Sequence, residues 1–251
     1  MKFSLGRCLY GAAAIAAGIS ALARHDIDTL NIVPHHEILT YIVAAIEIVA
    51  GISLQWPRAA RAATVALLAI YFIFALLAVP FIVAHPLVYN SYGNVFEQLS
   101  LASGAAILYA CCDQIVPARA ARFAQIGYYS FAICVISFAL EQLFYLNATA
   151  SLVPKWIPPG QMFWAVATTV AFALAAIALL TGFKAGLAAR LTAVMTVGFL
   201  LLTWLPLLFA NPHSFENWSE SAETLAIAAS AWIVADYLSQ RRTAKPGSRQ
   251  K

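Results

Sequence analysis

Long apolar stretches alternate with short polar segments along the whole chain. Each stretch has about 17 to 25 residues, which is the length of helix that crosses the apolar core of a bilayer. Most charged residues lie in the segments between the stretches. The pattern predicts eight membrane-spanning helices, at residues 3–23, 36–55, 61–84, 95–112, 123–146, 161–182, 187–210 and 219–238.

The second half of the chain repeats features of the first half. When the sequence is shifted against itself by 126 residues, two prolines and one glutamate fall on residues of the same type without a gap. The matched pairs are Pro80 and Pro206, Pro86 and Pro212, and Glu97 and Glu223. Such a pattern predicts a duplicated structural unit. We expect a four-helix repeat at 1–118, a second at 119–238 and a basic disordered tail at 239–251.

The composition places the chain among membrane proteins. Hydrophobic residues make up 62% of the 251 residues and charged residues only 10%, and the mean hydropathy is +0.79. A water-soluble core of this size does not require so apolar a chain. We therefore expect an all-α polytopic membrane protein in contact with the lipid bilayer. The basic tail fits a segment near anionic lipid and not an arm that binds nucleic acid.

Lys and Arg are distributed unevenly between the two ends of the predicted helices. Short cytoplasmic loops retain positive charge, and all but two of the 15 Lys and Arg residues lie on one side, with Arg24 and Lys155 on the other. We therefore expect an inner (cytoplasmic) membrane protein with both termini in the cytoplasm. Four spans per repeat give the repeats one orientation, as two parallel four-helix bundles related by an axis along the membrane normal.

The start of the chain allows a second interpretation. Lys2 and Arg7 precede an apolar run that ends in Ala21-Leu22-Ala23, as in a secretory signal with a small-residue cleavage site. The first span, however, occupies the place that residues 123–146 fill in the second repeat. We therefore expect residues 3–23 to be retained as a span.

The histidines and cysteines do not form a recognisable metal or redox motif. All five histidines lie at the predicted outer face. His85 and His213 end the third helix of each repeat, two positions out of register, whereas a haem needs two histidines that project from facing helices. The four cysteines include no C-x-x-C pair. The sequence therefore predicts neither haem nor metal.

Glu47 lies near the middle of a predicted span, with apolar residues on both sides. An ionised side chain at that depth costs at least about 2.5 kcal/mol. We therefore expect this carboxyl to be protonated or hydrogen-bonded inside the bundle. It would either bridge two helices, relay protons or contact a quinone. Arg58 is too far to pair with it, because 11 residues span about 16 Å along a helix.

Three other acids are candidate site residues. Glu97 and Glu223 occupy the first turn of the fourth predicted helix in each repeat, where the helix dipole favours a carboxylate. Asn94 and Glu97 have the spacing of a capping box, but Glu223 has no such partner, so the two acids could instead face a shared interior. Glu141, near the outer end of the fifth predicted helix, is either a pocket-lining acid or a solvated one at the interface.

Two phrases of the sequence resemble the DoxX-like family of integral membrane proteins. Glu47-Ile-Val-Ala-Gly51-Ile-Ser-Leu followed by Arg58-Ala-Ala-Arg61-Ala-Ala resembles the second helix and loop of that family, and Val153-Pro154-Lys-Trp156-Ile-Pro158 resembles its first loop. The resemblance implies that each repeat is one four-helix DoxX-like unit. Some members of the family are associated with quinone-linked sulfur or thiol redox systems. The second repeat has no acid at the place of Glu47, so this role would fall to the first repeat alone.

Three functions follow from these observations. The first is a membrane subunit of a quinone-linked redox complex, in which Glu47 contacts the quinone and other subunits of the complex are the partners. The second is a small-molecule or proton-coupled transporter with a pathway between the repeats. The third is a purely structural membrane component.

Overall fold

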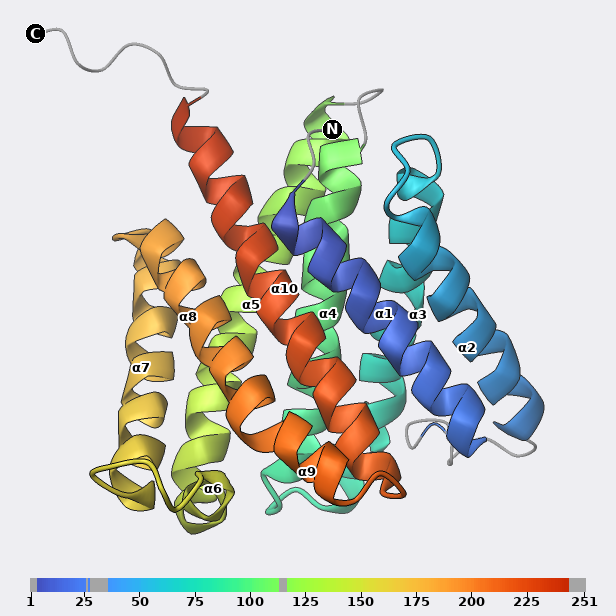
Figure 1. Cartoon of the computed structure of the whole chain (residues 1–251). Coiled ribbons are helices and arrows are strands. Elements are labelled where there is room, and N and C mark those ends of the chain that lie inside the picture. The colour runs from blue at the N-terminus through green and yellow to red at the C-terminus, as the bar shows by residue number, and fades with distance from the viewer. Residues whose placement is uncertain (1–3, 26, 28–35, 113–116, 244–251) are drawn as a thin grey trace, which may run out of the picture.

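The computed structural model describes residues 4–25, 27, 36–112 and 117–243, and these residues form helices and turns without a β-strand (Figure 1). A π-helical turn, Leu200–Trp204, joins two of the helices. The helices are α1 (Leu5–Arg24), α2 (His36–Ser53), α3 (Ala60–Ala84), α4 (Asn90–Cys112), α5 (Pro117–Phe144), α6 (Leu146–Leu152), α7 (Gln161–Thr181), α8 (Ala185–Phe199), α9 (Leu205–Ala210) and α10 (Phe215–Thr243).

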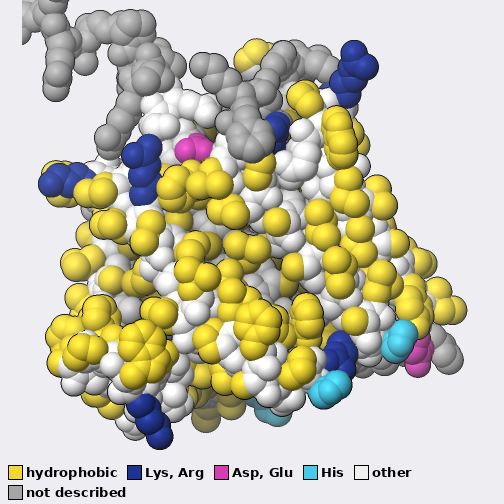
Figure 2. Space-filling view, in the orientation of Figure 1, with side chains coloured by type: hydrophobic (Ala, Val, Ile, Leu, Met, Phe, Trp, Pro, Cys, Tyr) yellow, Lys and Arg dark blue, Asp and Glu magenta, His cyan; other side chains and the backbone are white. Residues whose placement is uncertain are grey.

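Among the described residues, six segments are long and apolar enough to cross a membrane: α1, α3, α4, α5, α7 and the continuous stretch Ala185–Ala210. Large hydrophobic side chains stay exposed on the flanks, among them Val83 at 78% and Phe209 at 80%. They cover the surface between the two ends of the molecule, where most of the visible Lys, Arg and His side chains lie (Figure 2). So large an apolar surface suits lipid. The protein is therefore a multi-pass membrane protein.

Helices also form at the other two predicted spans. α2 has 18 residues, and α10 has 29 but is more polar because it carries Glu223 and Asp236 among its apolar residues. Neither belongs to the six apolar segments, so eight crossings stay a prediction. α1 begins and α10 ends on the same side of the molecule (Figure 1).

Several helices extend beyond the apolar stretches from which they were predicted. α4 begins at Asn90 instead of residue 95, and α10 continues to Thr243 instead of residue 238. Backbone hydrogen bonds of a helix continue through polar residues after the apolar stretch has ended. Residues 239–243, predicted to begin the disordered tail, are therefore helical, and residues 244–251 lie outside the described part of the chain.

The two predicted repeats pack against each other through their last helices. α4 and α10 contact each other in the middle of the molecule, α3 and α5 lie on α4, and α1 and α8 lie on α10. α2 packs on α1, and α7 packs on α5. The first helix of each predicted repeat thus lies on the last helix of the other. The two halves of the chain therefore pack into one continuous set of helices, and the predicted division into two separate four-helix bundles is not seen in the described residues.

Glycines bring α1 and α2 unusually close together. A Cβ atom added to Gly51 of α2 would lie 2.5 Å from the carbonyl oxygen of Gly11 on α1, and one added to Gly11 would lie 2.6 Å from the Gly51 oxygen. Further along the same contact, a Cβ added to Gly18 would lie 2.6 Å from the Ala44 oxygen. Small residues let membrane helices pack backbone to backbone. These three glycines therefore fix the distance between α1 and α2.

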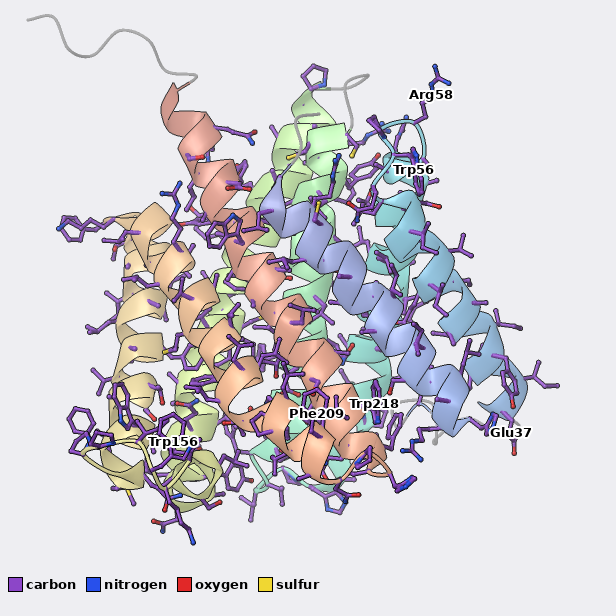
Figure 3. The ribbon with its side chains drawn as sticks, in the orientation of Figure 1. Glu37, Trp56, Arg58, Trp156, Phe209 and Trp218 are labelled. Carbon is purple, nitrogen blue, oxygen red and sulfur yellow. The ribbon has the colours of Figure 1, made fainter. Side chains whose placement is uncertain are left out.

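Tryptophans mark both ends of the molecule. Trp56 and Arg58 lie at one end, and Trp156, Trp218 and Glu37 lie toward the other (Figure 3). Trp56 is 58% exposed and Trp156 is 74% exposed. Exposed tryptophans prefer the headgroup region of a bilayer. Their positions are those expected for a protein that crosses the whole membrane.

Candidate functional site

The four candidate acids line two cavities that meet at the α4–α10 contact. Cavity A has a volume of about 290 Å³ and is enclosed by α1, α2, α3, α4 and α10. Cavity B has a volume of about 590 Å³ and is enclosed by α4, α5, α6, α7, α8 and α10. Glu47 lines cavity A and Glu141 lines cavity B, whereas Glu97 and Glu223 line both. The structure therefore brings together residues from both halves of the sequence.

Glu47 is buried in the wall of cavity A, with 3% of its surface exposed. The close contact of α1 at Gly18 holds α2 here, because a Cβ added to Gly18 would also lie 3.3 Å from the Cβ of Glu47. The hydroxyl of Tyr71 on α3 lies beside the carboxyl as its hydrogen-bonding neighbour. Burial inside the bundle is what the sequence predicted for Glu47; its role stays a prediction.

Two buried tyrosines continue from Glu47 into the core. The rings of Tyr71 and Tyr10 meet edge to face with 6.3 Å between their centroids. The hydroxyl of Tyr10 donates a hydrogen bond of 2.6 Å to the carbonyl oxygen of Leu101 on α4. Both rings are almost fully buried. The side of cavity A at Glu47 is therefore held in place by α1, α3 and α4 together.

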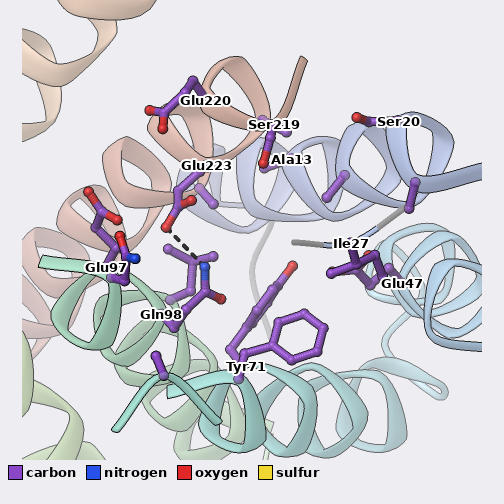
Figure 4. A pocket seen from close by; sticks show the side chains of 18 of the residues that line it. Ala13, Ser20, Ile27, Glu47, Tyr71, Glu97, Gln98, Ser219, Glu220 and Glu223 are labelled. Carbon is purple, nitrogen blue, oxygen red and sulfur yellow. Dashed lines mark hydrogen bonds between the residues drawn. The ribbon is translucent and has the colours of Figure 1, made fainter. Parts of the chain in front are cut away.

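The opposite wall of cavity A carries Glu97, Gln98 and Glu223 (Figure 4). The amide nitrogen of Gln98 donates a hydrogen bond of 3.1 Å to Oε1 of Glu223. The amide oxygen of Gln98 is buried and has no partner among the described residues. Ser20 of α1, which is 3% exposed, also lines the cavity with an unpartnered hydroxyl. The cavity thus presents polar groups that no other side chain satisfies.

The predicted position of Glu97 and Glu223 in the first turn of a helix is wrong. α4 begins at Asn90 and α10 begins at Phe215, so each glutamate lies two turns inside its helix. Neither side chain can cap the helix from there, because capping groups act within the first turn. The other interpretation agrees with the structure, since both carboxyls face the shared interior.

Four glutamates form a group around the α4–α10 contact, and we call them the glutamate cluster: Glu97, Glu141, Glu220 and Glu223. Glu223 interacts electrostatically with the other three, and Glu141 also interacts with Glu97 and Glu220. Glu141 is oriented toward α4 because Gly93 leaves room for it: a Cβ added to Gly93 would lie 2.6 Å from Cδ of Glu141. Of the two interpretations of Glu141, the structure supports the pocket-lining one.

No Lys, Arg or His lies among the described residues that line either cavity. Each ionised carboxyl inside the bilayer costs at least about 2.5 kcal/mol, and neighbouring carboxylates repel one another. The glutamate cluster and Glu47 therefore cannot all be ionised without cations to balance them. The arrangement can hold protons, exchange them with a bound molecule, or bind a cation.

The histidines lie apart from this site. The hydroxyl of Tyr41 is 2.7 Å from Nδ1 of His25. His85 follows the last residue of α3, and His213 lies in the turn between α9 and α10; neither lines a cavity. His35 lies outside the described residues. Within the described part of the chain, no group of three His, Cys, Asp or Glu residues is arranged to hold a metal ion.

Sequence reasoning missed Tyr71, Gln98 and Glu220, which belong to the same walls. Gln98 directly follows Glu97, and Glu220 lies one helical turn before Glu223, so proximity to the matched acids was a usable signal for both. Tyr71 carried no such signal, because only the packing of α3 on α2 places it beside Glu47.

Comparisons of the chain with protein-family models, with curated proteins and with solved structures found no match. Membership in the DoxX-like family is therefore a prediction from the two sequence phrases.

Proposed function

We propose that the protein is an eight-span, duplicated DoxX-like protein of the inner membrane with both termini in the cytoplasm. The contacts between helices support the duplication. A Cβ added to Gly6 of α1 would lie 2.9 Å from Cγ1 of Ile233 on α10, and one added to Gly127 of α5 would lie 2.9 Å from Cγ1 of Ile107 on α4. Ile107 and Ile233 are 126 residues apart, which is the shift that aligns the two halves.

We further propose that this membrane protein serves a quinone-linked redox complex and binds the quinone headgroup in cavity A. The observation that carries the proposal is the buried carboxyl of Glu47 beside the Tyr71 hydroxyl, in a wall otherwise formed by groups such as Phe74 and Phe81. A quinone has a flat apolar ring, which suits aromatic and aliphatic walls. Its two carbonyl oxygens accept hydrogen bonds, which a protonated Glu47, Tyr71 and Gln98 can donate.

The glutamate cluster gives the cavity a place for protons. Oxidation of a quinol releases two protons and two electrons. The carboxyls of Glu47, Glu97 and Glu223 can accept the protons inside the bilayer, because all three line cavity A. The electrons pass to a redox centre in a partner subunit of the complex. In this proposal the chain supplies the quinone site and the proton acceptors, and the partner supplies the electron acceptor.

Quinone binding to the detergent-purified chain tests the proposal. We expect saturable quenching of tryptophan fluorescence by decylubiquinone. Binding should be about fivefold weaker in Glu47→Gln, because an amide N–H is a weaker donor than a carboxyl O–H and a neutral hydrogen bond is worth about 1 kcal/mol. Glu37→Gln is the matched control, because Glu37 lies on the same helix but is exposed. Equal affinity in the wild type and Glu47→Gln, or no saturable binding, contradicts the proposal.

A proton-coupled transporter is the second candidate. The observation that favours it is that cavities A and B share Glu97, Glu220 and Glu223, so that three glutamates line both spaces. Toward the inner end, fully buried residues such as Ala14, Ile107 and Phe131 fill the core, so transport would require these helices to separate. Proton uptake into proteoliposomes on addition of a substrate would support this candidate. If no substitution of an intramembrane acid affects anything but folding, a purely structural component is the remaining function.

A further inference from the structure

Cavity B differs from cavity A in size and in the chemistry of its walls. Its volume of about 590 Å³ lies in the range of sites for small organic molecules. Aromatic rings line it from α5, α7 and α8, from the residue between α5 and α6, and from the π-helical turn. These rings belong to Phe138, Tyr145, Trp164, Phe172, Phe199 and Trp204.

Contacts between the aromatic rings hold the wall in place. The Phe172 ring lies 5.7 Å from Phe138 and 6.1 Å from Phe199, measured between centroids. Trp164 donates a hydrogen bond of 3.0 Å from its indole nitrogen to the carbonyl oxygen of Pro158. All four of these aromatic residues line cavity B. The face of an aromatic ring attracts a cation.

The remaining wall of cavity B is acidic. Glu141, Glu220 and Glu223 line it together with Glu97 and Glu216, and the described lining residues include no Lys, Arg or His. Thr224 lines the same space and is 7% exposed. A bound cation would balance the charge of the carboxylates in this wall.

A π-helical turn forms part of this wall and has no counterpart in the first half of the chain. Leu202, Thr203 and Trp204 of the turn line cavity B. In the first half, α3 continues as a regular helix from Ala60 to Ala84, through Pro80. Single π-turns are frequent at functional sites because they displace side chains from the regular helical positions. The turn therefore distinguishes the larger cavity B from cavity A.

We propose that cavity B binds an organic ammonium cation, with the charged nitrogen against the aromatic faces and next to Glu141 and Glu223. Carboxylates attract the charge, and the aromatic rings accept the methyl or methylene groups around the nitrogen. A bare metal ion fits less well, since no group of three His, Cys, Asp or Glu residues in the described part of the chain is arranged to hold one. This site is separate from the quinone site proposed at Glu47, although both use Glu97 and Glu223.

The test compares two probes of the same shape. Benzyltrimethylammonium and the uncharged neopentylbenzene differ in one atom, nitrogen or carbon, and in charge. Binding of each to the full-length wild-type protein in detergent is measured by isothermal titration calorimetry. We expect saturable binding of the ammonium probe, at least about tenfold tighter than that of the neutral probe. Equal affinity for the two probes, or no saturable binding of the ammonium, overturns the proposal.

Variants locate the site within the protein. Glu141→Gln and Trp164→Leu should each weaken binding of the ammonium probe by about tenfold, because both residues line cavity B. Glu47→Gln and Trp56→Leu are the controls, since neither residue lines that cavity. Loss of ammonium binding in Glu47→Gln but not in Glu141→Gln would overturn the assignment to cavity B. Glu47→Gln also separates the two proposals, because it should weaken only quinone binding.

Discussion

The contact between Gly51 and Gly11 allows the packing of α1 on α2 to be tested with one methyl group. In Gly51→Ala the new Cβ would lie 2.5 Å from the Gly11 oxygen and 2.8 Å from Cγ1 of Ile15. An ordinary contact of 3.4 Å requires the backbones to separate by about 0.9 Å at this point. Such overpacking costs about 1 to 3 kcal/mol, whereas alanine gains up to about 1 kcal/mol over glycine inside a helix.

We therefore expect Gly51→Ala to lower stability by about 1 to 2 kcal/mol. Gly198→Ala is the matched control, because a Cβ added there meets nothing within 4 Å, so the helix propensity of alanine should make this variant as stable as the wild type or more stable. In thermal unfolding followed by circular dichroism in one detergent, the midpoints of the two variants should differ by about 2 to 12 °C.

The same experiment reports on the site, because Gly51 lies one turn after Glu47 on α2. Separation of α1 from α2 should loosen the wall of cavity A, so Gly51→Ala should also weaken quinone binding while Gly198→Ala does not. If Gly51→Ala unfolds at the same temperature as Gly198→Ala, the backbone contact between α1 and α2 is not as close as the structure has it, and the reasoning fails.

Two further predictions concern the site and the orientation. Tyr71→Phe removes the hydroxyl beside Glu47 but keeps the buried ring, so quinone binding should weaken about fivefold to tenfold. Tyr129→Phe is the control, because Tyr129 is exposed, and it should not change quinone binding. Unchanged binding in Tyr71→Phe would show that this hydroxyl is not part of the site. In a cysteine-free background, a membrane-impermeant maleimide should label Lys155→Cys in intact cells but label Arg58→Cys only after lysis. The reason is that loops rich in Lys and Arg stay in the cytoplasm. The opposite labelling would show that the protein has the opposite orientation.

The sequence predicted where helices form much better than where they end. Apolar stretches located all eight long helices because lipid exposure requires continuous apolar surface. The beginnings of α4 and α10 were misplaced because their first turns are polar but still helical. This error produced the wrong capping interpretation of Glu97 and Glu223. The π-turn at Leu200–Trp204 has no signal in a hydrophobic pattern, since all its residues but Thr203 are apolar.

The sequence could identify single residues of the candidate site but not how they come together. Glu47 stood out because an acid inside an apolar stretch is costly, and it is indeed buried. That Glu141 would join Glu97, Glu220 and Glu223 could not be predicted, because their approach depends on α5 packing on α4 and α10 packing beside both. The 126-residue shift indicated that Glu97 and Glu223 are equivalent, but the shared cavities follow from the three-dimensional arrangement alone.

The packing of α1 on α10 also constrains how the protein is made. Tyr10, Ala13 and Ala14 of α1 are buried in the finished protein, and α10 supplies part of that burial. α1 is the first of these helices to leave the ribosome and α10 is the last. At about 5 to 20 residues per second, α1 waits roughly 10 to 45 seconds in the bilayer before its partner arrives. During synthesis, lipid or an insertion factor must therefore cover the surface that α10 later occupies.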